Sequence, residues 1–245
     1  MTQRIAGVSP SSKARIAGGL WLIVIAMGIF ALMSMSSLIV RDDAATTVNN
    51  ILANESLFRL SVVADIVAGL CYVGVTVLLY GLLKPVSRSL SLLAAFFGLG
   101  GFAIGGPAFL SRLAALVLLQ GDQYLSVFTT SQLQAMALTS LKLHAFGFYI
   151  SLMLFGSQCI ILGYLIVRST FLPRILGVLL AIGGVGYMAS SFGIILSPSV
   201  GDLLSPFVLP AGLLGEGSLT LWLLLKGVND SLWVEQAASL TRRST

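Results

Sequence analysis

The chain has 245 residues, of which 57% are hydrophobic and 9% are charged, and its formal net charge is +5. A soluble domain could not cover its surface with so few polar groups, so the composition excludes a soluble protein and predicts a membrane protein that partners the lipid bilayer. The basic excess is typical of cytoplasmic membrane loops and therefore gives no indication of a nucleic-acid partner.

Several apolar segments are long enough to cross the hydrocarbon layer as helices, which takes about 20 residues each. Only helices and closed barrels satisfy the backbone in lipid, and apolar runs of this length favour helices. We therefore predict an all-α fold, a polytopic six-transmembrane-helix bundle over residues 16–226, with an N-terminal tail over 1–15 and a C-terminal tail over 227–245. The predicted spans are 16–40, 57–83, 90–119, 135–167, 175–196 and 204–225.

The basic residues lie mainly on one side of this arrangement, and only Arg41 and Arg59 flank the other side. Because cytoplasmic loops carry the excess of Lys and Arg, we expect both termini in the cytoplasm. The first apolar run exceeds the roughly 7–15 residues of a signal-peptide core, so we interpret it as a retained span. The residues expected on the cytoplasmic side are Arg4, Lys13, Arg15, Lys84, Arg88, Arg168, Arg174, Lys226, Arg242 and Arg243.

Two polar segments lie outside the spans, and their sequences indicate secondary structure less clearly. The segment 41–56 places Val48, Ile51 and Leu52 at helical spacing. It is therefore either a short amphipathic helix, lying on the membrane surface or capping the bundle, or a solvated loop with one helical turn. After Gly227 the composition is polar, and we expect a partly disordered tail.

Five charged or histidine side chains lie away from the ends of the predicted spans, in their outer halves: Asp65, Arg112, Lys142, His144 and Glu216. An unpaired charge near the centre of a membrane helix costs about 2.5–3.5 kcal/mol even on the lenient insertion scale. We therefore expect these residues to face one another. Lys142 is the exception, because it lies about 200° around the helix from His144 and is expected to snorkel outward.

Helical phase places further polar residues on the same faces as these charges. One stripe contains Ser61, Asp65, Tyr72 and Thr76, and another contains Ser140, His144, Ser151 and Gln158. Arg112 shares its face with glycines 101 and 105, which leave room for a neighbouring helix or for a ligand. The candidate residues for ligand binding or proton coupling are Asp65, Arg112, His144, Glu216, Gln158 and Tyr72.

These residues allow both structural and functional interpretations. Arg112 with Asp65 or Glu216 forms either a structural ion pair or a site in which Arg112 receives an anionic or polar headgroup. His144 is either a hydrogen-bonded structural residue or a proton switch. Glu216 lies far from both ends of its span and cannot easily snorkel, so it is the strongest functional candidate.

No catalytic residue, cofactor or metal site is predicted. A single histidine excludes a site with several His ligands, and the motifs HExxH and GxSxG are absent from the sequence. Cys71 and Cys159 fall inside spans and are interpreted as packing residues. The sequence offers no activated nucleophile, so it favours a function other than catalysis.

Short motifs along nearly the whole chain resemble an uncharacterised family of bacterial multi-pass membrane proteins defined by a domain of unknown function. The resemblance implies a bacterial inner-membrane location and a shared fold, and it supplies no activity or site residue. Its motifs are ARIAG at 14–18, NILA at 50–53, LFRL at 57–60, LYGLLKPV at 79–86, FLPRILG at 171–177, GVGY at 184–187, LPA at 209–211, GE at 215–216, LWLL at 221–224 and KGV at 226–228.

The sequence leaves three function classes open. The leading hypothesis is a protein that binds or transports a small amphipathic or anionic molecule, such as a lipid, at a polar site in the outer half of the bundle. The alternative is a structural or regulatory subunit, acting as a homo-oligomer or with a membrane partner protein. An intramembrane enzyme is the third and weakest hypothesis.

Overall fold

The computed structural model describes residues 9–243, without the side chains of residues 198, 202, 205 and 241–243. The elements are α1 (Pro10–Leu38), α2 (Ala44–Ala53), α3 (Glu55–Leu83), α4 (Arg88–Leu119), the 3-10 turn η1 (Gln123–Val127), α5 (Thr130–Arg168), α6 (Arg174–Leu196), α7 (Pro198–Gly212), the π-helical turn η2 (Leu213–Gly217), α8 (Ser218–Leu225) and α9 (Asp230–Arg243).

Within the described residues, six helices are long and apolar enough to cross a membrane, and no strand occurs. They are Pro10–Leu38, Glu55–Leu83, Arg88–Leu119, Thr130–Arg168, Arg174–Leu196 and Pro206–Leu225. The predicted all-α bundle with six spans is therefore confirmed. Residues 1–8 of the expected N-terminal tail lie outside the described residues, and the cytoplasmic location of the termini stays a prediction.

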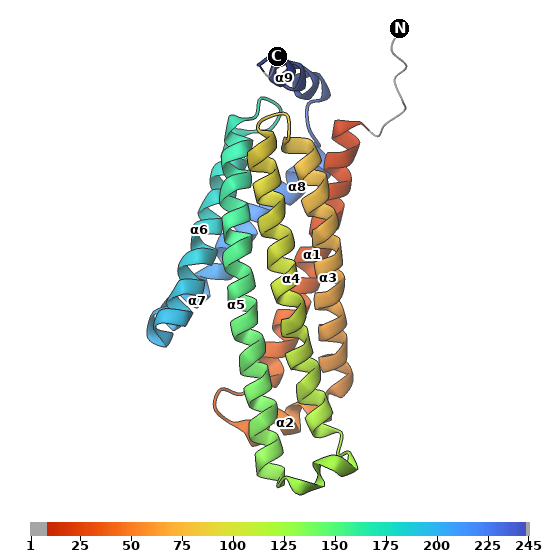
Figure 1. Cartoon of the computed structure of the whole chain (residues 1–245), viewed down its shortest axis with the longest axis vertical. Coiled ribbons are helices and arrows are strands. Elements are labelled where there is room, and N and C mark those ends of the chain that lie inside the picture. The colour runs from red at the N-terminus through yellow and green to blue at the C-terminus, as the bar shows by residue number, and fades with distance from the viewer. Residues whose placement is uncertain (1–8, 244–245) are drawn as a thin grey trace.

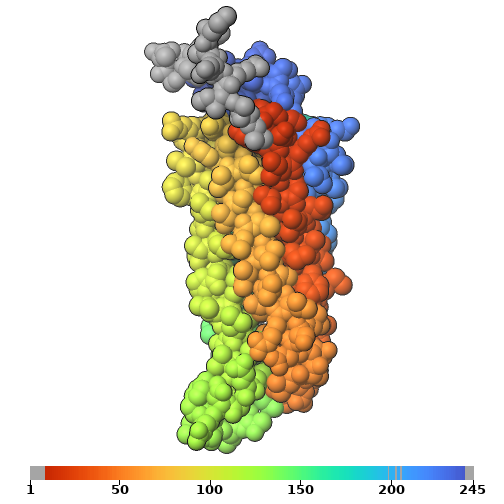
Figure 2. Space-filling model, turned by 90° about the vertical axis from the view of Figure 1, so that its right-hand side faces the viewer, coloured from red at the N-terminus to blue at the C-terminus, as the bar shows by residue number. Residues whose placement is uncertain are grey.

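The spans run back and forth between two ends of an elongated bundle (Figure 1). One end, which we call the terminal end, holds the first turn of α1 and the helix α9, and the opposite distal end holds α2 and the connection from α4 to α5. Figure 2 shows α1 beside α3 along one face. The α6–α7 hairpin stops part-way along the bundle (Figure 1), because α6 has 23 residues whereas α5 has 39.

Small residues allow α5 and α6 to pack backbone to backbone. A Cβ atom built at Gly163 would lie 2.5 Å from the carbonyl oxygen of Gly177, and one at Gly156 would lie 2.7 Å from that of Gly184. In lipid, where apolar surfaces have no solvent-driven tendency to associate, such close van der Waals contact is a main source of helix attraction. The α5–α6 interface therefore depends on the absence of side chains at these positions.

Two apolar clusters fill the bundle, one in each half. The terminal core includes Trp21, Leu79, Leu162, Leu180 and Leu219 from five helices. The distal core lies around α2 and the far ends of the long helices, and it contains Leu38, Val48, Ile51, Phe58, Val62, Ala115, Leu116, Ala137 and Leu141. Large apolar side chains stay exposed on the outside of the spans, as expected for a surface that faces lipid.

The segment 41–56 forms the amphipathic helix α2, so the helical alternative for this segment is the one observed. Its buried residues Thr47, Val48 and Ile51 face the distal core, so α2 caps the bundle. The Thr47 hydroxyl accepts a hydrogen bond from the backbone N–H of Val40 at 3.0 Å. Hydrogen bonds from Thr46 to the Asp43 carboxylate cap the first turn and hold the pKa of Asp43 below its usual range.

The expectation of a partly disordered C-terminal tail is wrong for residues 230–243, which form α9. The side chain of Trp233 donates from Nε1 to the carbonyl oxygen of Leu82 at 2.8 Å, and the backbone N–H of Ser11 donates to Asp230 at 2.7 Å. Leu232 and Trp233 also pack against the terminal core. Apolar anchors on an otherwise polar segment thus dock it on the end of the bundle.

We predict that Gly163→Ala destabilises the protein, because the new methyl group would meet the Gly177 backbone. Overpacking of this kind lowers the free energy of unfolding by about 1–3 kcal/mol, which denaturant titration in mixed micelles would measure. Gly81→Ala is the matched control, since nothing lies within 4 Å of a Cβ atom there. Equal effects of the two substitutions would contradict the tight α5–α6 contact.

Candidate functional site

The candidate polar side chains gather at two levels along the bundle. The Arg112 level contains Ser61, Asp65 and Arg112, with His144 nearby. The Glu216 level contains Trp21, Tyr72, Gln158, Tyr187 and Glu216.

Arg112 is fully buried and already has partners from α3. Its guanidinium donates hydrogen bonds to the Asp65 carboxylate and to the Ser61 hydroxyl, and it lies 5.4 Å from the centroid of the Phe58 ring. Its Nε is the one guanidinium nitrogen without a partner among the described residues. Direct pairing and a cation–π contact are the arrangement expected of a structural ion pair.

The two other basic candidates of the distal half have partners of their own. The His144 ring lies with Nδ1 3.0 Å from the carbonyl oxygen of Ala108, one turn before Arg112. Lys142 points outward, as expected, and its ammonium donates to the Asp42 carboxylate at 2.8 Å. This hydrogen bond holds the pKa of Asp42, an exposed residue outside the spans, below its usual range.

The glycine face of α4 is occupied by the neighbouring helix. Phe155 of α5 packs against Gly101, and Ser151 packs against Gly105 and donates to the Gly101 carbonyl oxygen at 2.6 Å. The side-chain amide of Gln158 fills the space at Gly98. Of the two alternatives for this face, the structure shows a neighbouring helix.

At the Glu216 level, the stripe residues of α3 and α5 meet in the interior. The Tyr72 hydroxyl donates to Oε1 of Gln158 at 2.8 Å, and Nε2 of Gln158 donates to the Thr76 hydroxyl at 3.4 Å. The rings of Trp21 and Tyr72 meet edge to face at 6.3 Å. Side chains of α1, α3 and α5 are thus in contact at this level.

Glu216 lies on η2, a single π-helical turn that joins α7 to α8. Its carboxylate accepts a hydrogen bond from Nε1 of Trp21 at 2.9 Å, and the Tyr187 hydroxyl of α6 interacts with the same carboxylate. Within the described part of the chain it makes no ion pair. Acidic side chains that lie inside a membrane without a cation are unusual and mark functional sites by default.

The expectation that Glu216 shares a site with Arg112 in the outer half is not met by this geometry. On α3, Tyr72 lies seven residues from Asp65, a rise of about 10 Å, and on α5, Gln158 lies fourteen residues from His144, about 21 Å. Glu216 joins the level of Tyr72 and Gln158 because the α6–α7 hairpin is short and the last span begins part-way along the bundle.

The sequence analysis did not identify Trp21 or Tyr187 as members of a site. Each is an aromatic residue with a polar tip, placed deep within an apolar run. A buried indole N–H or phenol O–H needs a hydrogen-bond partner. That requirement is the signal by which both could have been assigned to a polar interior.

A family model described as "Domain of unknown function (DUF4386)" matches residues 16–227. The chain belongs to this family. The match confirms the resemblance to a family of unknown function. The matched residues of this DUF4386 protein include every residue of both polar levels, from Trp21 to Glu216. No curated protein and no solved structure matches the chain.

We predict that Arg112→Leu strongly destabilises this DUF4386 protein, because Asp65 would lose its cation in apolar surroundings. Breaking a buried pair lowers the free energy of unfolding by about 3–5 kcal/mol, whereas removing both charges is much less costly. The double variant Arg112→Leu/Asp65→Leu should therefore recover most of the loss in denaturant titrations. A double variant as unstable as the single one would contradict this pairing, and Lys142→Gln serves as the exposed control.

Proposed function

We propose that this protein binds a small amphipathic molecule within the bundle and transports it across the membrane, with Glu216 as the proton-binding residue. The observation that supports the proposal is the Glu216 carboxylate, which is held by Trp21 and Tyr187 on a π-helical turn and has no cationic partner among the described residues. Intramembrane carboxyl groups of this kind are typical of proton relays in transporters.

The backbone around Glu216 is suited to movement. Pro206 and Pro210 lie inside α7, where each lacks the N–H that would bond to the preceding turn. Pi-helical turns are frequent at functional sites, and interrupted membrane helices are common in transporters. The helix that carries Glu216 is thus the most irregular of the six spans. We propose that it undergoes the conformational change that transport requires.

The Arg112 level has a structural role in the proposed function. Arg112 is neutralised by Asp65 and hydrogen-bonded to Ser61, so its charge is not free to receive an anionic headgroup. The ligand proposed for the Glu216 level is therefore amphipathic with a neutral or cationic polar group. We place the protein in a bacterial inner membrane, as the resemblance to a family of bacterial membrane proteins implies. We place both termini in the cytoplasm, because the basic residues gather at the terminal end.

A structural or regulatory subunit is the second candidate. It is supported by the direct pairing at the Arg112 level and by the filled glycine face of α4, which together fix the register of α3, α4 and α5. Such a protein would act through contacts of its lipid-facing surface with a partner protein or with another copy of itself.

The first test uses dicyclohexylcarbodiimide, an apolar reagent that modifies protonated carboxyl groups in membranes. We expect modification of Glu216 and its decline as the pH rises, because the reagent requires the proton. Asp65 should react less than Glu216, because its carboxyl group is paired with the Arg112 guanidinium. Peptide mass spectrometry identifies the modified residue, and Glu55→Gln, a change at an exposed carboxyl group at the distal end, is the control that should leave modification of Glu216 intact. An unreactive Glu216 at every pH would refute the proton-binding role.

The second test separates the two candidates. Gentle purification followed by mass spectrometry should give a small amphipathic molecule that is retained by the wild type and lost from Glu216→Gln. Loss of the small molecule is expected because a glutamine side chain cannot bind and release a proton, as the proposed site requires. A stoichiometric partner protein, retained by both forms in place of a small molecule, would support the subunit instead.

A further inference from the structure

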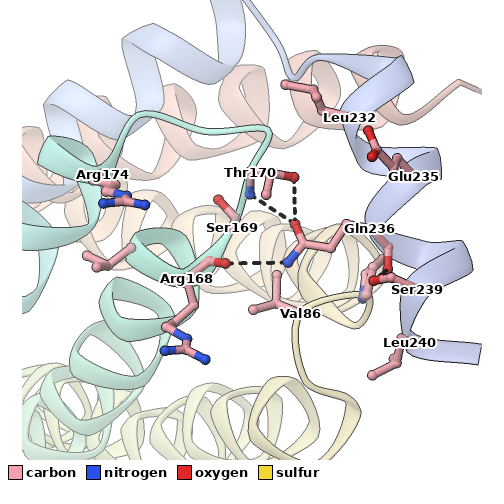
Figure 3. A pocket seen from close by; sticks show the side chains of 12 residues that line it. Val86, Arg168, Ser169, Thr170, Arg174, Leu232, Glu235, Gln236, Ser239 and Leu240 are labelled. Atoms are coloured by element: carbon pink, nitrogen blue, oxygen red, sulfur yellow. Dashed lines mark hydrogen bonds between the residues drawn. The ribbon is translucent and has the colours of Figure 1, made fainter. Parts of the chain in front are cut away.

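A pocket of about 760 Å³ opens at the terminal end, beneath α9 and away from both polar levels. Its volume lies within the range of about 300–1,000 Å³ that is typical of small-ligand sites. Figure 3 shows its walls: the α5–α6 connection with Arg168 and Arg174 on one side, and α9 with Glu235 and Ser239 on the other. The pocket is therefore a groove between a membrane hairpin and the docked C-terminal helix.

Gln236 of α9 fixes the distance between the two walls. Its Oε1 accepts hydrogen bonds from the backbone N–H of Thr170 at 2.9 Å and from the Thr170 hydroxyl at 3.0 Å (Figure 3). Its Nε2 donates to the carbonyl oxygen of Arg168 at 3.4 Å. Together with the Trp233 contact to Leu82, these bonds hold α9 in place, so the pocket is preformed.

The two walls carry opposite charges that do not neutralise each other. Arg168 and Arg174 on one wall and Glu235 on the other are all exposed, and none of them forms an ion pair within residues 9–243. Arg174 is also the first residue of α6, where free backbone N–H groups and the helix dipole favour an anion. An occupant that complements both walls carries a negative group toward the arginines and a positive group toward Glu235.

The position of the pocket identifies the source of such an occupant. Arg168 ends one span and Arg174 begins the next, so the pocket lies at the boundary where lipid headgroups meet water. The apolar side chains Val86, Val167 and Leu240 also line it, and they can contact the glycerol and upper acyl region of a lipid. Basic pockets between membrane helices at this level bind lipid headgroups in other proteins.

We infer that this pocket binds a phospholipid whose headgroup carries both a phosphate and a primary ammonium, the chemistry of phosphatidylethanolamine. Arg168 and Arg174 bind the phosphate with charge-assisted hydrogen bonds, and Glu235 accepts from the ammonium. A glycerol headgroup leaves Glu235 without a cation, and a choline headgroup has no N–H to donate. The inference does not depend on the function proposed for Glu216.

The test is competitive retention in native mass spectrometry of the full chain, delipidated in detergent. Equal amounts of phosphatidylethanolamine, phosphatidylglycerol and phosphatidylcholine with identical acyl chains are added. We expect the ethanolamine lipid to be retained about fivefold over the other two lipids. This ratio corresponds to the free energy of one charge contact at a membrane surface, about 1 kcal/mol. Arg168→Gln/Arg174→Gln should lower its retention about 25-fold, and Glu235→Gln should abolish the headgroup preference.

The control is Glu55→Gln/Arg59→Gln at the distal end, which removes an exposed ion pair without touching the pocket and should leave retention unchanged. Glu235 is exposed and its change to Gln is isosteric, so this variant reports on the headgroup even if the arginine variant fails to fold. Preference for the glycerol lipid, equal retention of all three lipids, or full displacement by soluble phosphoethanolamine at the same concentration would each overturn the inference.

Discussion

A polar side chain inside a hydrocarbon layer must find its partner within the protein, and this constraint organises the bundle. Arg112 is held by Asp65 and Ser61, His144 by a backbone carbonyl group, and the Tyr72 hydroxyl by Gln158. Each bond joins two different spans, so satisfying the polar groups also fixes the register of α3, α4 and α5. The glycine contacts between α5 and α6 then bring the remaining helices against this framework.

Much of this framework could be predicted from the sequence, because helical phase and membrane thickness are local properties. The stripe of Ser61, Asp65, Tyr72 and Thr76 points inward along its whole length, and each of its members has a hydrogen-bond partner in the interior. Apolar run length likewise predicted the six spans, and the spacing of Val48 and Ile51 indicated α2 as one alternative.

The vertical position of one helix relative to another could not be predicted in this way. Counting from helix ends placed Glu216 with Arg112, but the last span enters the bundle part-way along, after a hairpin that is shorter than its neighbours. The π-helical turn also changes the phase of Glu216 relative to a regular helix. Long-range packing sets both properties, so the partners Trp21 and Tyr187 became visible only in the folded chain.

The depth of Glu216 in the membrane determines how strongly the membrane potential acts on it. Glu216 is the eleventh residue of the span Pro206–Leu225, close to the middle of its 20 residues. A charge that crosses the whole membrane potential gains or loses about 2.3 kcal/mol per 100 mV, so a proton that reaches half depth from either side experiences about half of that energy. Under the proposed proton-binding role, the occupancy of Glu216 would therefore respond to voltage as well as to pH, and a cell could drive this carboxyl group electrically.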